Sequence, residues 1–201
     1  TEEMREYMAA YLVVLSVVMA LAFCVEIGKQ NNWTATFVIN RRTYRYSLTA
    51  VFWLLIFVTL CLFGGLRYKV GTDYESYSTM FLDICDDWFK NRYVGTEQGY
   101  VWLNRIVSLF THEPQAIFFV TNMIICAVGI FALSRFCRFA PFGMYIYFTT
   151  LYYYSFNIIR QGMACNFVFL AIGYGARREW KKCWFWIFVA GFFHQTAWLL
   201  M

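Results

Sequence analysis

The chain has 201 residues, of which 61% are hydrophobic and only 14% are charged. A soluble domain is typically about 45–50% apolar and about one quarter charged, so this composition excludes an ordinary soluble enzyme and indicates an integral membrane protein. The net charge of +5 reflects basic loops on one side of the membrane, as shown below, and gives no reason to expect nucleic acid as a partner.

Six stretches of the sequence are long and apolar enough to suit transmembrane helices of about 17–25 residues. In chain order they are residues 7–25, 48–66, 114–134, 139–157, 158–176 and 183–201. We therefore predict an all-α fold, a polytopic membrane helix bundle that forms a single transmembrane domain over residues 1–201. The chain begins at Thr1 and stops at the end of a predicted span, so we expect it to be part of a longer protein with further helices.

Two short amphipathic helices are expected in residues 67–113, between the second and third spans. The first has an apolar face made by Tyr74, Tyr77, Phe81, Ile84 and Trp88, and Thr72 and Glu75 are spaced as a capping box. The second has an apolar face made by Tyr100, Leu103, Ile106, Val107 and Phe110. Both are too short and too charged to span a bilayer, so we expect them to lie along the membrane interface above the bundle.

Arg160 is the only charged residue in the 38 positions from Phe139 to Ala176. At about 1.5 Å per residue, one helix of this length would reach ~57 Å, against a hydrocarbon core of roughly 30 Å, so the stretch must form two spans. The turn between them falls at the polar residues 155–161, which puts Arg160 near one rim of the bilayer. A guanidinium held there can bind a phosphate carried by a lipid, or it can simply anchor the span.

Basic residues are concentrated in three alternate loops between the predicted spans. Loops 26–47, 135–138 and 177–182 hold ten of the 17 lysines and arginines and only two of the 12 acidic residues. The positive-inside rule therefore places these loops in the cytoplasm. It places the N-terminus, residues 67–113 and Arg160 on the extracytoplasmic side.

Polar residues that suit an active site gather on this predicted outer side. They are Arg67, Lys69, Asp73, Glu97, Arg160, Gln161 and His194. His194 lies with Gln195 and Thr196 inside an otherwise apolar span, and its ordinary pKa of about 6.5 suits a general base. Structural alternatives stay open: interfacial anchors for the basic residues, a helix-dipole contact for Asp73, an exposed turn for Glu97 and a hydrogen-bonded core histidine for His194.

Four short motifs follow one another in the second part of the chain. They are Gly65-Leu-Arg67-Tyr-Lys69-Val-Gly71-Thr72-Asp73-Tyr74, Glu97-Gln-Gly-Tyr100, Arg160-Gln161-Gly-Met-Ala and Phe193-His194. Their order and placement resemble the EpsG family of exopolysaccharide biosynthesis proteins, relatives of the Wzy-type polymerases. The resemblance runs from about residue 60 to the end of the chain.

The resemblance implies a polysaccharide polymerase in a bacterial plasma membrane, active on the extracytoplasmic side in exopolysaccharide or capsule biosynthesis. Such a glycosyltransferase joins oligosaccharide repeat units carried on polyprenyl pyrophosphate, in contact with the lipid bilayer and with other polysaccharide-assembly proteins. Arg67, Lys69 and Arg160 would neutralise the pyrophosphate, and His194, Asp73 or Glu97 would take the acceptor proton. Tyr74, Tyr100 and Gln161 belong to the same motifs and are expected to bind substrate.

Neither an Asp-x-Asp motif nor a histidine cluster is present in the sequence, so we expect no metal and no other cofactor. Two other functions stay open. A membrane acyltransferase that modifies a surface glycan also combines an intramembrane histidine with arginines, although the outward position of His194 and Arg160 favours a lipid-linked sugar over a cytoplasmic acyl donor. A non-enzymatic lipid-glycan transporter would need polar residues at several depths of the membrane, whereas here they cluster at one side.

Overall fold

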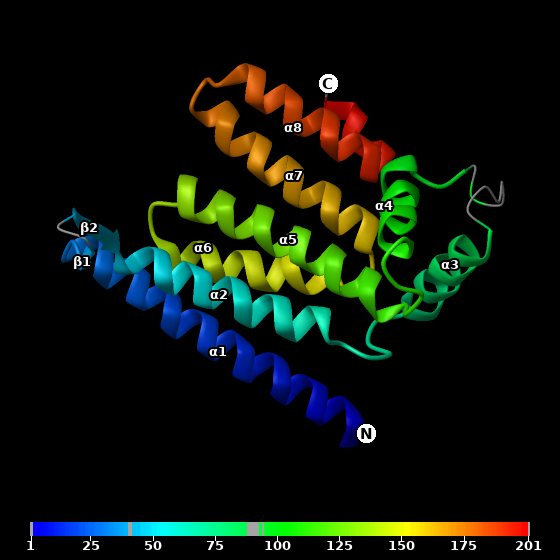
Figure 1. The fold of residues 1–201 in the computed structure, drawn as a ribbon, viewed down its shortest axis with the longest axis horizontal. Coiled ribbons are helices and arrows are strands. Elements are labelled where there is room, and N and C mark those ends of the chain that lie inside the picture. The colour runs from blue at the N-terminus through cyan, green and yellow to red at the C-terminus, as the bar shows by residue number, and fades with distance from the viewer. Residues whose placement is uncertain (1, 40–41, 88–92, 94, 201) are drawn as a thin grey trace.

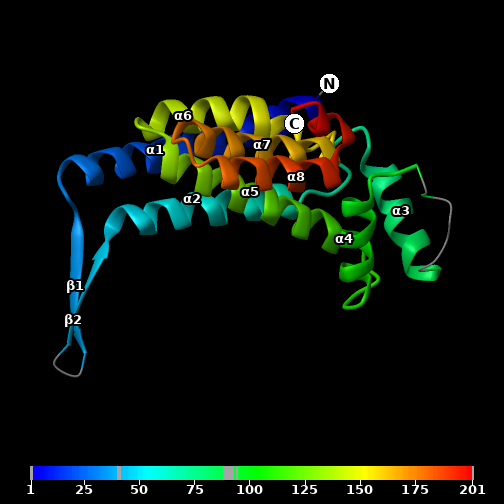
Figure 2. The same ribbon diagram turned by 90° about the horizontal axis from the view of Figure 1, so that it is seen from above.

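The computed structural model describes residues 2–39, 42–87, 93 and 95–200, and the chain is mostly helical. One bundle of helices that lie side by side makes up most of the molecule (Figure 1): α1 (Glu2–Gln30), α2 (Leu48–Gly65), α5 (Gln115–Phe136), α6 (Ala140–Ile146), α7 (Ile159–Ala176) and α8 (Trp180–Phe193). The short helices α3 (Tyr74–Asp86) and α4 (Gln98–Ser108) lie at one end of this bundle, and a β-hairpin projects from the other end (Figure 2).

Three helices in the described part of the chain are long and apolar enough to cross a membrane. They cover Tyr7–Gln30, Leu48–Gly65 and Gln115–Phe136, in agreement with the first three predicted spans. The later predicted spans, between residues 139 and 201, are built from shorter or more polar helices. The chain is therefore a membrane protein by length and composition of its helices, and the count of six spans stays a prediction.

The all-α prediction is wrong for residues 34–47, which were predicted from the sequence to be part of a cytoplasmic loop. Strands β1 (Thr34–Ile39) and β2 (Arg42–Ser47) form an antiparallel hairpin in which Thr34 pairs with Ser47. The strands are rich in threonine, tyrosine, valine and isoleucine, whose β-branched and aromatic side chains favour an extended backbone. The expected loop is thus a two-stranded extension that follows directly on α1.

The predicted span 139–157 changes its helical geometry part-way along. Helix α6 passes into a π-helical segment, η2 (Tyr147–Tyr152). The hydroxyl of Thr149 donates to the carbonyl oxygen of Tyr145 at 2.8 Å, and that of Thr150 donates to Ile146 at 2.7 Å. These side chains compete with backbone amides for the carbonyls of the preceding turn, which favours the wider turn of a π-helix.

The predicted span 183–201 is wrong as a single helix. Helix α8 ends at Phe193, His194 has an extended backbone with φ −156° and ψ 120°, and Gln195–Leu200 form a 3-10 helix, η3. Segment η3 folds back on α8, because the ring of Trp198 packs against Phe188 at 5.4 Å between ring centroids. The break leaves His194 at the end of a helix rather than in the middle of one.

Polar groups inside the bundle tie α2 to its neighbours. The side-chain amide of Asn122, on α5, donates to the carbonyl oxygens of Leu60 and Cys61 at 3.0 and 3.1 Å. The hydroxyl of Tyr152 donates to Leu60 at 2.7 Å. Gly64 permits this close approach, because a Cβ atom there would lie 2.8 Å from the side-chain carbon of Asn122. These contacts fix the position of α2 along the axis of the bundle. They thereby also fix the position of the chain segment that follows at Arg67.

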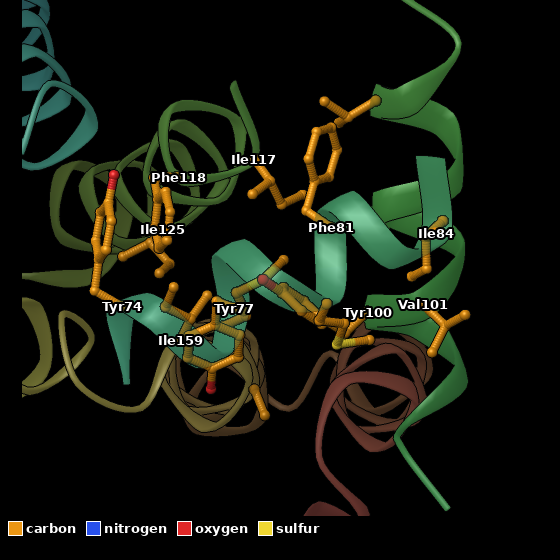
Figure 3. Close-up of a cluster of buried hydrophobic side chains, with 14 of the residues drawn as sticks. Tyr74, Tyr77, Phe81, Ile84, Tyr100, Val101, Ile117, Phe118, Ile125 and Ile159 are labelled. Carbon is orange, nitrogen blue, oxygen red and sulfur yellow. The ribbon is translucent and has the colours of Figure 1, made fainter. Parts of the chain in front are cut away.

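Helix α3 packs on the ends of α5 and α7 through the face that the sequence predicted to be apolar. Tyr74 stacks on Phe118 with 4.3 Å between ring centroids, and Tyr77 meets Tyr100 edge to face at 5.4 Å (Figure 3). Phe81 and Ile84 are also buried, whereas Trp88 lies outside the described residues. The location of α3 at a membrane interface stays a prediction.

Two expectations for this region are wrong in detail. The capping box does not form, because Asp73 occupies the N-cap position of α3 and makes no side-chain cap bond. Helix α4 buries Tyr100, Asn104 and Val107, while Ile106 and Phe110 of the predicted apolar face are exposed. Asn104 can occupy the buried face because its side-chain amide donates to the carbonyl oxygen of Tyr100 at 2.7 Å, within the helix.

Candidate active site

The turn before α7 sets the position of Arg160 at the end of the bundle. Residues 155–158 leave the helical path, and the side-chain oxygen of Asn157 accepts a hydrogen bond from the backbone amide of Thr72 at 3.0 Å. Gly71 lies in this contact with φ +105°, a conformation that favours glycine. The turn is thus bound to the segment between α2 and α3, and Arg160 follows it in the first turn of α7.

Glu97 connects two residues that are remote from it in sequence. One carboxylate oxygen, Oε2, forms an ion pair with Nη1 of Arg160. The other oxygen, Oε1, lies 2.8 Å from Nδ1 of His194. The Glu97 side chain is only 12% exposed, and it stands immediately before α4, which packs against α8. The structure therefore brings three of the predicted site residues into one cluster.

The Glu97 carboxyl is charged in this cluster. Burial alone would raise its pKa, but a hydrogen bond to its own backbone amide, the contact with His194 and the positive charge of Arg160 outweigh burial and lower the pKa below the ordinary value. An ionised carboxylate can only accept, so the Nδ1 atom of His194 donates to it. The Nε2 atom of a neutral His194 is then left as an acceptor, which is the state that a general base needs.

A polar pocket of about 560 Å³ opens beside this cluster, between α3 and the chain around residue 95. Arg160 forms part of its wall together with Asp73, Tyr77, Tyr93 and Thr96. Tyr77 also interacts directly with the Arg160 side chain. Aromatic rings, hydroxyls and carboxylates in one wall are the groups that bind the faces and hydroxyls of sugars.

A second cavity, of about 500 Å³, lies on the other side of the cluster. It runs beside α7 between the end of η2 and η3, and we call it the α7 groove. Gln161 and His194 line one end of the groove, and aliphatic and aromatic side chains line most of the rest. The cluster of Glu97, Arg160 and His194 thus stands between a polar pocket and an apolar groove.

Arg67 is not part of this cluster. Its side chain is 7% exposed, and its guanidinium lies over the rings of Phe156 and Phe118, with Cζ at 4.5 and 5.3 Å from the ring centroids. Its Nε atom has no hydrogen-bond partner among the described residues, and burial lowers the pKa of the guanidinium. Tyr100 interacts electrostatically with both Arg67 and Arg160.

The remaining predicted residues separate into three groups. Asp73 and Gln161 line the polar pocket and the α7 groove, respectively. Lys69, with φ +54°, lies over the ring of Tyr68 and lines a different cavity of about 250 Å³ near the start of α1. Tyr74 and Tyr100 are buried in the packing between α3, α4 and the bundle, so a substrate cannot touch the Tyr100 ring in this structure.

Comparison with known proteins assigns the chain to a family. A model of the EpsG family matches residues 50–201. The chain belongs to the EpsG family. No curated protein and no solved structure shows a significant match to it.

The EpsG match begins at residue 50, near the start of α2, and includes every element that follows α2. All the site residues, from Arg67 to His194, therefore lie within the family region, whereas α1 and the β-hairpin lie before it. The family assignment thus applies to the part of the molecule that builds the cluster, the polar pocket and the α7 groove.

Neither Tyr77 nor Tyr93 was predicted from the sequence to line the polar pocket of this EpsG-family protein. Tyr77 was assigned only to the apolar face of a helix, which explains its burial but not its contact with Arg160. The hydroxyl of Tyr93 donates to Asp83 at 2.6 Å, which orients its ring at the pocket wall. Among the described residues, no group of three or more His, Cys, Asp or Glu side chains is placed to hold a metal ion.

Proposed function

We propose that this EpsG-family protein polymerises oligosaccharide repeat units carried on polyprenyl pyrophosphate, at the extracytoplasmic side of a bacterial plasma membrane. The observation that carries the proposal is Glu97, whose two carboxylate oxygens contact Arg160 and His194 at the junction of a polar pocket and an apolar groove. A substrate made of a sugar, an anionic link and a lipid chain needs a polar pocket, a cationic site and an apolar groove side by side. Membership of the EpsG family supports a role in exopolysaccharide biosynthesis.

In this proposal His194 is the general base. The acceptor hydroxyl gives its proton to Nε2 of His194, while the acceptor oxygen forms a bond to the anomeric carbon of the donor. The negative charge of Glu97, at Nδ1, stabilises the imidazolium that results, as a carboxylate does for the histidine of acyl-transfer triads. Glu97 is then a positioning residue, and its low pKa keeps it from taking the proton itself.

Arg160 acts on the leaving group. The bond between the anomeric carbon and the pyrophosphate oxygen breaks, and the electron pair stays on the pyrophosphate. A guanidinium has five N–H donors, and the contact with Glu97 occupies only part of this fork, so other donors can bind phosphate oxygens at the pocket wall. A fixed positive charge in a partly buried site stabilises the negative charge that develops there.

The polar pocket provides the sugar environment. Tyr77 and Tyr93 offer aromatic surface, and Asp73 and Thr96 offer hydrogen-bonding groups on the same wall. Asp73 is a second candidate for the proton acceptor, but within the described part of the chain its side chain meets the hydroxyl of Thr72 at 3.4 Å and no histidine. The paired arrangement of Glu97 and His194 therefore favours His194 for this role.

The deciding experiment is to incubate the purified full-length protein with lipid-linked repeat units and to separate the products by size. We expect a ladder of polymers with the wild type and none with His194→Ala. A matched control is His112→Ala, since His112 is exposed and lies outside the site. Wild-type protein that moves the lipid-linked units across a vesicle membrane without lengthening them would overturn the proposal in favour of a transporter.

A further inference from the structure

The α7 groove has a polarity gradient along its length. The residues that line it from α7 recur at i, i+3, i+4, i+7, i+8 and i+11, so they form one stripe of the helix: Gln161, Ala164, Cys165, Val168, Phe169 and Ile172. The stripe extends over 12 residues, from Gln161 to Ile172, and these two ends are 11 residue steps apart, or roughly 16 Å at about 1.5 Å per residue. Only its first residue is polar, and that end also receives His194.

The break in the chain at His194 forms the opposite wall. Because η3 leaves the axis of α8 and folds back, its residues Ala197 and Leu200 face the groove. The same fold-back is held by Trp198, which packs on Phe188 and Phe192 of α8 with 5.4 and 6.0 Å between ring centroids. A continuous helix through residue 201 would not place these residues beside α7.

The position of the polar end selects the kind of molecule that fits. Gln161 follows Arg160 directly in the chain, and His194 is held by Glu97, so the groove ends at the cluster proposed to bind an anionic link. An apolar channel that ends beside a cation and an amide donor is complementary to an amphiphile with one long chain and a phosphate at its head. Small residues at the polar end, Ala164 and Ala197, leave room for a branched chain beside the head.

The geometry points to this groove as the binding site for the head-proximal isoprene units of a polyprenyl phosphate or pyrophosphate. This inference rests on the proposed function, which supplies the lipid carrier, and adds where the carrier lies. The chain runs along α7 between η2 and η3, and the phosphate lies at Arg160 and Gln161. The glycan then extends past Glu97 into the polar pocket on the opposite side of the cluster.

Cys165 provides a test that needs neither sugar nor turnover. It lines the groove, whereas Cys183, near the start of α8, lies outside it, so both thiols can be followed in one molecule of unchanged sequence. We would treat the full-length protein in nanodiscs with a membrane-permeant maleimide and quantify modification of each cysteine by peptide mass spectrometry. The probes are undecaprenyl phosphate and, at the same concentration, a straight-chain phosphatidic acid.

We expect undecaprenyl phosphate to slow the modification of Cys165 by tenfold or more and to leave Cys183 unchanged, while phosphatidic acid protects neither. Equal protection of Cys165 by phosphatidic acid would mean that the groove holds any membrane lipid, and no protection would mean that it holds no carrier. Either result overturns the inference. Protection without any polymer ladder would instead retain the lipid site and overturn the proposed polymerase activity.

Discussion

Glu97 and His194 are 97 residues apart in the chain, and their side chains meet at 2.8 Å between Oε1 and Nδ1. The contact joins the start of α4 to the end of α8, at the point where the backbone turns out of the helix. The extended backbone at His194 is what lets the ring reach Glu97, so the break in α8 and the catalytic proposal depend on the same local geometry.

Replacement of Glu97 by glutamine tests whether its charge positions and activates His194. The amide keeps the size of the side chain but cannot stabilise an imidazolium, so we expect the polymerisation rate to fall by about 10²–10⁴-fold. The rate per folded molecule should be measured with lipid-linked repeat units. Glu113→Gln, at an exposed residue before α5, is the matched control and should retain full activity. Normal turnover by the Glu97→Gln protein would mean that the Glu97 carboxylate has no part in the reaction.

The lowered pKa of Glu97 predicts a pH dependence of stability. A carboxyl whose pKa is lower in the folded than in the unfolded state contributes stability above its unfolded pKa and loses it as the pH falls through the folded pKa. The difference in thermal stability between wild type and Glu97→Gln should therefore be constant at neutral pH and shrink below the ordinary value of 4.5. Melting curves of both proteins over this range measure it. A difference that grows on acidification would contradict the assigned ionisation.

The sequence was sufficient to select the members of the cluster but not to assemble it. Arg160 stood out because a single charge interrupts a long apolar stretch, and His194 because it lies among apolar residues. Glu97 had no such signal, since a carboxylate in a polar loop is ordinary, and it was selected through its place on the predicted outer side and in the motif Glu97-Gln-Gly-Tyr100. Its role depends on a contact between α4 and α8, which is a property of tertiary packing that spacing along one chain does not encode.

The failures of prediction have related causes. Tyr74 and Tyr100 belong to the recognised motifs, yet the structure buries both in packing contacts, and a motif does not show which of its side chains are buried. Their role in substrate binding stays a prediction. The break at His194 was missed because the window from 183 to 201 contains no charged residue and satisfies a length criterion. The packing of Trp198 on α8, which stabilises the fold-back, involves aromatic contacts that hydropathy does not register.

Replacement of Arg160 by lysine tests whether the guanidinium of Arg160 binds the pyrophosphate. Lysine keeps the positive charge but replaces the planar fork of donors by a single ammonium group, which cannot contact Glu97 and two phosphate oxygens in the same way. Loss of one charge-assisted hydrogen bond of about 1.5–3 kcal/mol corresponds to a fall in rate of about 10-fold to 100-fold. The control is Arg105→Lys on α4, where the guanidinium lies over Trp102 outside the cluster. If the Arg160→Lys protein made normal polymer, Arg160 would be only an interfacial anchor and would not bind the pyrophosphate.

Tyr100→Phe distinguishes a packing role from substrate binding. The ring is fully buried, and its hydroxyl has no hydrogen-bond partner within the described part of the chain. Because an unpaired buried hydroxyl costs roughly 1–3 kcal/mol, its removal should leave the melting temperature unchanged or raise it, with normal turnover. Tyr100→Ala should instead lower the free energy of unfolding by about 3–5 kcal/mol, since it creates a cavity. A loss of activity in a stable Tyr100→Phe protein would mean that this hydroxyl contacts the substrate.

The orientation of the molecule is the prediction on which the extracytoplasmic site depends. In Figure 1 the N-terminus, α3, α4 and the end of α8 share one end of the bundle, and the turn between α7 and α8 lies at the other. The basic residues of that turn, Arg177, Arg178, Lys181 and Lys182, place it in the cytoplasm by the positive-inside rule. A membrane-impermeant thiol reagent added to intact cells should therefore label Glu113→Cys and not Arg178→Cys, in a background whose native cysteines have been replaced. The reverse pattern would put the Glu97 cluster in the cytoplasm, where a lipid-linked glycan displayed on the outer surface could not reach it.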